Sequence, residues 1–484
     1  MPFPLNVAPI RKNLGNSASF LSIGAGAGGD VFQALQLQFT EIHAVEVNPY
    51  INRLMTDGML KDYSGRIYLD PRVKVVTEDA RSYVRRFDNR FDVIYSLSSN
   101  TFAALASGAF ALAENYLFTV EAFQDYYRAL SPRGFLVMEH QRYVPRLVGE
   151  AMEALRAQGV DHPERHLAVF ALPNMHRQVL VLSKQPMDVA FLREANAHYD
   201  PDEIQQLFPE QDPKADPLIS SIINHGWQQA APKASIDLSP CHDTRPFTSQ
   251  LGLWRHFKFK RITDPSAIDF NGFPASKVMI LILLAIIAII VLPLNWIPAR
   301  QKNAGLGWRG WGYFFAIGLG FMMLEVVLIQ QYTLLIGPSA YTVAVILVTL
   351  LVGSGLGSRW TPNVKTWVPF MAILLWILVD ILAFLPFTRA LAGLPMWARS
   401  AAAAAAIAPL AFFMGMPFPM GTFRAKTFID WGFAVNGAAS VLGSACVMLV
   451  SFHWGFPVAM GLSGLAYLAA LGLLSSCKTQ DAFS

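Results

Sequence analysis

Short apolar runs alternate with helix-compatible segments over residues 1–185, which predicts an α/β domain with a mainly parallel sheet. The five predicted parallel strands are mostly apolar and cover residues 20–23, 42–46, 73–77, 91–95 and 135–139. Two later runs, 166–172 and 178–183, flank a turn and predict an antiparallel hairpin at the sheet edge. This ending favours a methyltransferase-type Rossmann sheet over that of a dehydrogenase. The lead segment contains Pro2, Pro4 and Pro9 and is predicted to be a poor helix.

The pattern changes beyond residue 277 to long apolar runs, each close to the ~20 residues that cross a bilayer as a helix. Seven spans are predicted, at about 278–297, 311–335, 341–358, 367–388, 399–416, 431–452 and 456–476. We therefore expect a Rossmann domain at 1–185, a connecting juxtamembrane region at 186–276 and a transmembrane helical domain at 277–477. The predicted fold class is an α/β Rossmann-like domain followed by an α-helical transmembrane bundle.

Small and ionisable residues inside the predicted spans indicate where the helices pack. Small residues suited to close helix–helix contact occur at Gly353, Gly355, Gly357, Gly437, Ala438, Ser440 and Gly443. Glu325 and Asp380 lie within spans, where acidic side chains usually face a bundle interior or a cavity. Two interpretations stay open for them: a polar pathway or headgroup site, or an interhelical hydrogen bond.

Charge and cysteine content narrow the function classes. The formal net charge of +4 is too small to predict nucleic-acid binding. Basic residues gather before the first span, at Arg255, Lys258, Lys260, Arg261 and Lys277, as a juxtamembrane anchor would. Cys241, Cys446 and Cys477 form neither a disulfide framework nor a metal motif. Basic loops on both sides leave the topology open, and we expect the Rossmann domain in the cytoplasm because residues 1–20 contain no secretory signal.

The turn after the first strand carries the clearest binding motif. Gly24, Gly26 and Gly28 follow an apolar strand and precede a helix, as in nucleotide-binding βαβ units. Glu46 ends the next strand at the spacing of a carboxylate that accepts both ribose hydroxyls. Asp79 follows the third strand, where it could bind an adenine amino group or cap a helix, and both roles stay open. The predicted cofactor-binding set is Gly24, Gly26, Gly28, Asp30, Glu46, Asp79, Ala80 and Ser96.

Four motifs at strand ends carry a family resemblance: Ile23–Asp30, Ala44–Pro49, Glu78–Arg81 and Phe91–Ile94. They resemble the spermidine synthase superfamily, which implies a Rossmann domain that binds S-adenosylmethionine or its decarboxylated form. A membrane-bound branch of that superfamily is similar at Ala109–Phe123, Asp243–Phe247, Gly320–Glu325, Gly353–Ser358, Pro417–Gly421 and Asn436–Ser440. Relatives in this branch look longer at the N-terminus, so we expect a shortened version or a fragment. Asp243 and Arg245 are expected to dock the soluble part onto the membrane part.

This sequence departs from the spermidine synthase pattern at the residues that handle the aminopropyl group and the attacking amine. Spermidine synthases carry acidic residues at the positions of Leu97 and Asn100, and an aspartate in the glycine loop at the position of Ala27. Leucine accepts no proton, and asparagine does not neutralise an ammonium group. The residues that could act on an acceptor instead are Asn100, Glu139 and His140, of which His140 could equally be a loop histidine.

Three functions are consistent with these motifs. The first is a membrane-anchored transferase that moves a methyl or aminopropyl group to an amine or a membrane-associated acceptor. The second is a polyamine aminopropyltransferase proper, with another base in place of Leu97. The third is a transporter or sensor that binds a nucleoside or polyamine without turnover. The expected partners are the lipid bilayer and the small-molecule or membrane-associated acceptor, and homo-oligomerisation stays open.

Overall fold

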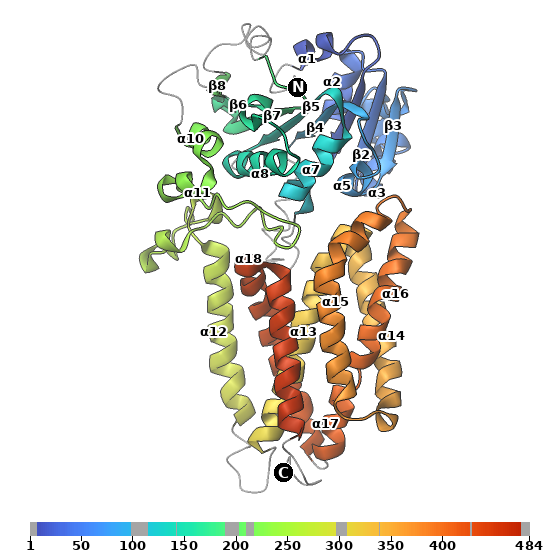
Figure 1. Ribbon diagram of the computed structural model, residues 1–484, viewed down its shortest axis with the longest axis vertical. Coiled ribbons are helices and arrows are strands. Elements are labelled where there is room, and N and C mark those ends of the chain that lie inside the picture. Colours follow the sequence, from blue (N-terminus) through green and yellow to red (C-terminus); the bar gives the residue numbers. More distant parts are fainter. Residues whose placement is uncertain are drawn as a thin grey trace. The chain divides into compact units, whose positions relative to one another are not determined.

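The computed structural model describes residues 7–97, 115–141, 143–188, 203–209, 217–296, 307–337, 339–425 and 428–475. The described chain forms two compact units: the N-terminal unit ends at Pro274, and the helical unit begins at Ala275 (Figure 1).

An eight-stranded sheet organises the N-terminal unit, in the order β3-β2-β1-β4-β5-β7-β6-β8. The strands are β1 Ser19–Ile23, β2 Glu41–Glu46, β3 Val73–Thr77, β4 Phe91–Leu97, β5 Leu130–His140, β6 Leu167–Leu172, β7 Arg177–Ser183 and β8 Gln205–Phe208. The first five are parallel, and β6 and β7 pair antiparallel with each other, as do β7 and β5. The predicted Rossmann fold and the antiparallel hairpin of β6 and β7 are confirmed, but β8 and not the hairpin forms the sheet edge. Strand β8, which pairs antiparallel with β6, was not predicted.

Helices cover both faces of this sheet, each over its own apolar core. They include α1 Ala8–Asn13, α2 Gly29–Gln36, α3 Pro49–Thr56, α5 Ala80–Val84, α7 Val120–Ala129, α8 Val144–Ala157 and α10 Pro217–His225. One core includes residues of α5, α7, α8 and α10, and the other residues of α1, α2 and α3. Helix α1 corrects the expectation for the lead segment. Pro9 lies in its first turn, where the missing N–H has no partner to lose.

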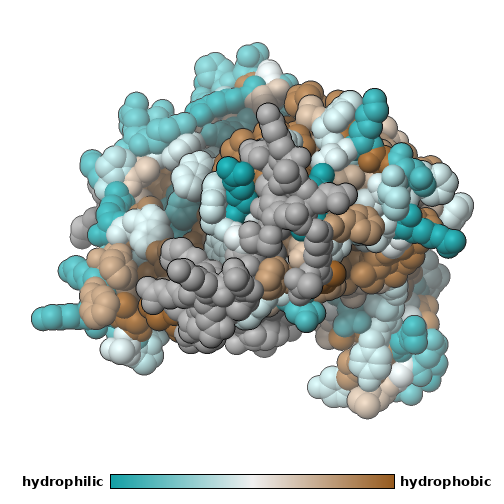
Figure 2. Space-filling model, turned by 90° about the horizontal axis from the view of Figure 1, so that it is seen from below, coloured by the Kyte–Doolittle hydropathy of each residue, from teal (hydrophilic) through white to brown (hydrophobic). Residues whose placement is uncertain are grey.

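The helical unit consists of α12 Ala275–Trp296, α13 Trp308–Ile336, α14 Ser339–Trp360, α15 Val368–Leu391, α16 Met396–Met414, α17 Pro417–Ala425 and α18 Ile429–Ser475. Five of the described helices are long and apolar enough to cross a membrane. Large apolar side chains are exposed on them, Leu382 among them, and such residues are brown in Figure 2. The described part of α12 is a shorter apolar helix, Ala275–Ile289.

Helix α18 is interrupted at Gly455, where the chain leaves helical geometry with φ +80° and ψ 178°. Pro457 follows two residues later and offers no N–H to the helical ladder. The interruption lies between the two last predicted spans, 431–452 and 456–476.

Asp380 joins two helices of this unit through hydrogen bonds. Its carboxylate accepts from the Gln331 amide at 2.8 Å and from the Tyr332 hydroxyl at 2.9 Å. The donors belong to α13 and the acceptor to α15. Of the two interpretations left open, the structure therefore gives Asp380 the interhelical hydrogen bond. Glu325 lies half-buried on α13.

Glycines spaced four residues apart bring α14 and α16 into close contact. A Cβ at Gly357 would lie 1.7 Å from the carbonyl oxygen of Phe412, and one at Gly353 would lie 2.4 Å from the Cβ of Ala411. A Cβ at Gly355 would meet nothing within 4 Å. The predicted packing stripe is thus made by Gly353 and Gly357, whereas Gly355 points elsewhere.

Replacing Gly357 by alanine is expected to destabilise the helical unit by about 1–3 kcal/mol, because the backbones of α14 and α16 must separate. The matched change Gly355→Ala adds the same methyl group to the same helix and should cost little. Thermal unfolding of the detergent-solubilised full chain measures both. Equal midpoints for the two variants would contradict the packing assignment.

Candidate functional site

The carboxyl ends of five parallel strands bring the predicted site residues to one edge of the sheet. Ile23, the last residue of β1, pairs with Val45 of β2 and with Ser96 of β4. Glu46 pairs with Thr77 of β3, and Leu97 pairs with Glu139 of β5. In open α/β sheets ligands bind at this edge, beside the strand where the order reverses, which here is β1.

The loop between β1 and α2 adopts left-handed backbone conformations, which glycine tolerates better than other residues. Gly24, Gly26 and Gly28 have φ values of +72°, +51° and +77°. The N–H groups of Gly24 and Ala25 both donate to the carbonyl of Val45, at 2.9 and 3.0 Å. A Cβ at Gly26 would meet only the Gly24 carbonyl oxygen, at 3.8 Å, so a ligand has room to approach the backbone there.

Glu46 is held against this loop by backbone donors. Its carboxylate accepts from the N–H of Gly26 at 3.1 Å and from the N–H of Asn48 at 2.8 Å. These bonds fix the carboxylate at the tip of β2 beside the loop. The side chain is only partly buried, so it keeps acceptor capacity for a further donor.

Tyr68 holds the glycine loop through a hydrogen bond to its backbone. The sequence did not predict it as a site residue. Its hydroxyl donates to the carbonyl of Gly26 at 2.9 Å, and the residue is 3% exposed. A Cβ at Gly28 would lie 2.8 Å from the Tyr68 ring and 2.6 Å from Ile67. Gly28 therefore makes room for these side chains. The only signal in the sequence was the apolar triplet 67–69 inside an otherwise polar loop.

Asp30 lies inside the unit, beneath the glycine loop. Its carboxylate bonds the Ser22 hydroxyl and accepts from the N–H of Val31 at 3.0 Å. Burial raises the pKa of Asp30 to about 6, although the Ser22 hydroxyl bond opposes the rise. This carboxyl group thus contacts β1 from the first turn of α2.

Asp79, Ala80 and Ser96 lie at the ends of β3 and β4. Asp79 caps α5, since its carboxylate accepts from the N–H of Ser82 at 2.8 Å. This is one of the two roles left open for it, and its second oxygen leaves the adenine role a prediction. Ala80 and Ser96 are both buried, at 7% and 1% exposure.

The predicted catalytic residues differ in their surroundings. Asn100 lies outside the described residues. Glu139 is ion-paired with Arg177, and burial raises its pKa. His140 stacks on Tyr143 with ring centroids 3.9 Å apart, and burial lowers its pKa to about 3. These contacts give both side chains structural partners, and a catalytic role for them stays a prediction.

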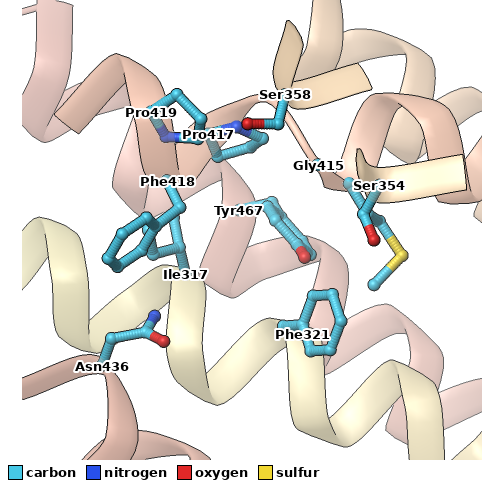
Figure 3. A pocket seen from close by; sticks show the side chains of 11 residues that line it. Ile317, Phe321, Ser354, Ser358, Gly415, Pro417, Phe418, Pro419, Asn436 and Tyr467 are labelled. Carbon is cyan, nitrogen blue, oxygen red and sulfur yellow. The ribbon is translucent and has the colours of Figure 1, made fainter. Parts of the chain in front are cut away.

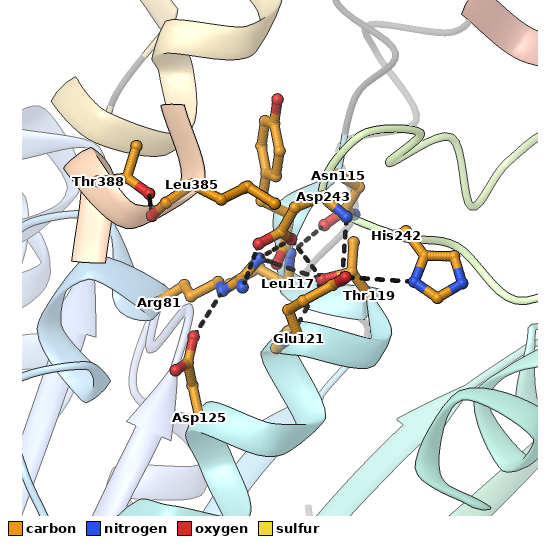
Figure 4. Close-up of polar contacts among 12 residues, drawn as sticks. Arg81, Asn115, Leu117, Thr119, Glu121, Asp125, His242, Asp243, Leu385 and Thr388 are labelled. Carbon is orange, nitrogen blue, oxygen red and sulfur yellow. Dashed lines mark hydrogen bonds and ion pairs between the residues drawn. The ribbon is translucent and has the colours of Figure 1, made fainter. Parts of the chain in front are cut away.

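Arg81 forms a buried polar cluster next to this edge (Figure 4). Its guanidinium group holds Asp243 through two hydrogen bonds, one of them 2.8 Å long, and holds Asp125 at 3.1 Å. Thr119, the N-cap of α7, donates to Asp243 at 2.8 Å. Arg81 and Asp243 are each 1% exposed. Asp243, which we expected to dock the membrane part, has its partner within the N-terminal unit, so that expectation is corrected.

Asp243 belongs to a segment, Asp237–Leu251, that we call the strap. The N–H of Asp237 donates to the carbonyl of Leu251 at 2.8 Å, which closes the strap on itself. Arg146 of α8 donates to the strap carbonyls of Thr248 and Gln250, at 2.8 and 3.1 Å. Part of the predicted connecting region is thus built into the N-terminal unit.

Glu150, one helical turn beyond Arg146, also faces the strap. One of its oxygens accepts from the N–H of Cys241 at 2.9 Å. The other is buried and has no hydrogen-bond partner in the described part of the chain. Burial raises the pKa of Glu150 to about 8, against the opposing effects of the Cys241 N–H and the Arg146 charge. A protonated Glu150 is therefore the form that suits this site near neutral pH.

Comparisons with known proteins show which family the N-terminal unit is similar to. Residues 4–190 match the family model of the spermine/spermidine synthase domain. A polyamine aminopropyltransferase of Clostridium botulinum is 31% identical over 139 residues, which cover 28% of this chain and 43% of the relative. One of Alkaliphilus oremlandii is 32% identical over 142 residues, with the same coverage of 28% and 43%. The alignments thus span less than half the length of these relatives.

A spermidine synthase of Thermotoga maritima is among the similar solved structures. It is 20% identical, with a TM-score of 0.30, over 47% of this chain and 72% of the solved one. Within the N-terminal unit, residues 4–190 are therefore identified as similar to the spermine/spermidine synthase domain, and this match covers less than half of the chain.

Proposed function

We propose that the N-terminal unit binds S-adenosylmethionine or its decarboxylated form, and that the chain transfers a methyl or aminopropyl group from it. The acceptor is an amine or a membrane-associated molecule. The observation that carries the proposal is the carboxylate of Glu46, fixed by the N–H groups of Gly26 and Asn48 at the tip of β2. A carboxylate so placed suits the two hydroxyls of a ribose.

The residues at the strand ends fit such a nucleoside. Glu46 would accept from the ribose hydroxyls, and the open backbone at Gly26 would let the ligand approach. Asp79 and Ala80 would meet the adenine ring. When bound, the cofactor supplies an activated sulfonium group, so the protein mainly has to hold an acceptor in line with it.

Leu97 favours methyl transfer over aminopropyl transfer. Its side chain is 40% exposed at the end of β4, where spermidine synthases carry an acidic base. Aminopropyl transfer to an amine needs such a base, whereas methyl transfer can rely on positioning. The similarity to polyamine aminopropyltransferases supports aminopropyl transfer as the second candidate. A nucleoside- or polyamine-sensing transporter without turnover is the third.

We further propose that the chain is an integral membrane protein of the plasma or inner membrane, with the N-terminal unit in the cytoplasm. The five long apolar helices support membrane insertion. The interruption of α18 at Gly455 and the apolar helix α12 support seven spans.

Replacing Glu46 by glutamine is expected to weaken nucleoside binding at least tenfold. The amide lacks the negative charge, and hydrogen bonds to charged groups contribute about 1.5–3 kcal/mol. Calorimetric titration of the detergent-solubilised full chain with S-adenosylmethionine, and separately with its decarboxylated form, measures the effect. Tighter binding of the carboxylated compound supports methyl transfer, and the reverse supports aminopropyl transfer.

Glu41→Gln is the matched control, because Glu41 starts the same strand at its opposite end. It should leave both affinities unchanged. Binding of neither compound by the parent chain would refute the cofactor assignment. Binding with no group transfer to any offered amine would favour the non-catalytic candidate.

A further inference from the structure

A partly open cavity of about 330 Å³ lies between helices of the helical unit (Figure 3). This volume is at the lower end of the ~300–1,000 Å³ that small-molecule sites occupy. Its walls come from α13, α14, the end of α16 with the turn after it, α17 and α18. The cavity therefore lies where five separate segments of one unit meet.

Four motifs of the helical unit that the proposed transfer reaction does not use contribute to this one cavity. They supply Phe321, Ser354 with Ser358, Pro417–Pro419 at the start of α17, and Asn436. These segments are far apart in the sequence. Their convergence on a single hollow indicates a site rather than a local packing defect.

Tyr467 supplies a hydrogen-bond donor to the cavity. The residue is 1% exposed, and its hydroxyl takes part in no hydrogen bond in the described part of the chain. A Cβ at Gly320 would lie 3.2 Å from the Tyr467 ring. The ring can pack closely against α13 because Gly320 has no side chain. Because Tyr467 lines the cavity, its hydroxyl can donate a hydrogen bond to a ligand there, and such a bond contributes about 0.5–1.5 kcal/mol.

Asn436 supplies the complementary acceptor. Its amide N–H donates to the carbonyl of Phe314 at 3.3 Å, which fixes the orientation of the amide. The amide oxygen remains available, and in Figure 3 the Asn436 amide lies at the same hollow as Phe321 and Tyr467. A ligand group that both donates and accepts, such as a hydroxyl or an amide, matches this pair.

The walls contain no acidic or basic side chain among the described lining residues. A charged ligand would find no counter-ion among these lining residues, although Glu325 acts electrostatically on Tyr467 from outside the lining. Ile317, Phe321 and Phe418 add apolar surface. We propose that this cavity binds a neutral amphiphile, with a hydroxyl- or amide-bearing end at Asn436 and Tyr467 and an apolar end against the aromatic wall.

Photolabelling of the full chain in lipid nanodiscs tests the proposal. The probe is a monoacylglycerol that carries a diazirine and an alkyne in its acyl chain. The same acyl chain ending in a carboxylate, and an alkylamine of equal length, serve as charged controls. We expect the neutral probe to label cavity residues at least tenfold more than either control, and excess unlabelled monoacylglycerol to compete.

Two variants with matched controls test the residues. Tyr467→Phe removes only the donor and should weaken competition about fivefold. Tyr341 lies on α14 and is 49% exposed, so Tyr341→Phe should leave the competition unchanged. Ser358→Leu adds bulk at the exposed rim of the cavity and should reduce saturable labelling, unlike Ser444→Leu on α18, outside the cavity lining. Thermal unfolding verifies that all four variants fold.

Three outcomes would overturn the proposal. The first is stronger labelling by the amine or the carboxylate. The second is labelling that no excess of monoacylglycerol reduces. The third is labelling that Tyr467→Phe and Ser358→Leu leave unchanged. The readout involves no nucleoside and no group transfer, so it is separate from any failure of the proposed transferase.

Discussion

Replacing Arg81 by methionine is expected to destabilise the N-terminal unit by about 3–5 kcal/mol, the usual cost of removing one partner of a buried ion pair. Arg81 is 1% exposed and faces two carboxylates, Asp125 and Asp243. Without the guanidinium group, the carboxylate of Asp243 keeps only the hydroxyl of Thr119 as a donor within the described part of the chain. Pulse proteolysis of the detergent-solubilised full chain across a urea series measures the loss.

Arg66→Met is the control for this change. Arg66 pairs with Asp62 at 2.8 Å, but the two side chains are 66% and 75% exposed. Solvent screens such a pair, so its removal should change the urea midpoint only slightly. Similar midpoints for Arg81→Met and Arg66→Met would show that the buried cluster does not stabilise the unit.

The second large effect is a pH dependence that Glu150 gives to the N-terminal unit. The pKa of its carboxyl is about 8 in the folded chain and 4.5 as the ordinary value. Between these values the folded state keeps a proton that the unfolded chain releases, so stability falls as pH rises. The slope is at most about 1.4 kcal/mol per pH unit, and it ends above the folded pKa.

Glu150→Gln removes this titration while its amide oxygen still accepts from the N–H of Cys241. The parent chain should therefore lose stability relative to the variant from pH 5 to pH 8, by pulse proteolysis in urea. Asp30, with its pKa raised to about 6, contributes equally to both proteins and cancels in the difference. Parallel pH profiles would rule out a buried, protonated Glu150.

Local patterns were enough to predict seven of the eight strands of the sheet, all but β8, and the glycine loop. The alternation of apolar runs identified the five parallel strands and the hairpin, and Glu46 was placed correctly at the tip of β2. The strands, the hairpin and the position of Glu46 depend on residues that are close together in the sequence. The Asp79 cap is likewise a short-range signal, since Asp before a helix accepts from its first turn.

Long-range partners were beyond such patterns. The bond between Arg81 and Asp243 joins residues 162 positions apart, and no periodicity marks it. Tyr68 reaches Gly26 across 42 residues from a segment that looks like a polar loop. Gly353 and Gly357 contact α16 while Gly355 does not, a choice made by helix rotation, which the sequence GSGLGS leaves open.

The strap follows Arg81 by many residues, which delays completion of the buried Arg81 cluster during synthesis. At about 5–20 residues per second, a ribosome needs roughly 8–32 s to reach Asp243 after Arg81. Throughout that interval the nascent Rossmann sheet lacks Asp243, one of the two carboxylates that face its buried guanidinium group. The strap ends at Leu251, only 24 residues before α12 begins at Ala275. The N-terminal unit therefore receives its last strap residues shortly before the apolar helix α12 is synthesised.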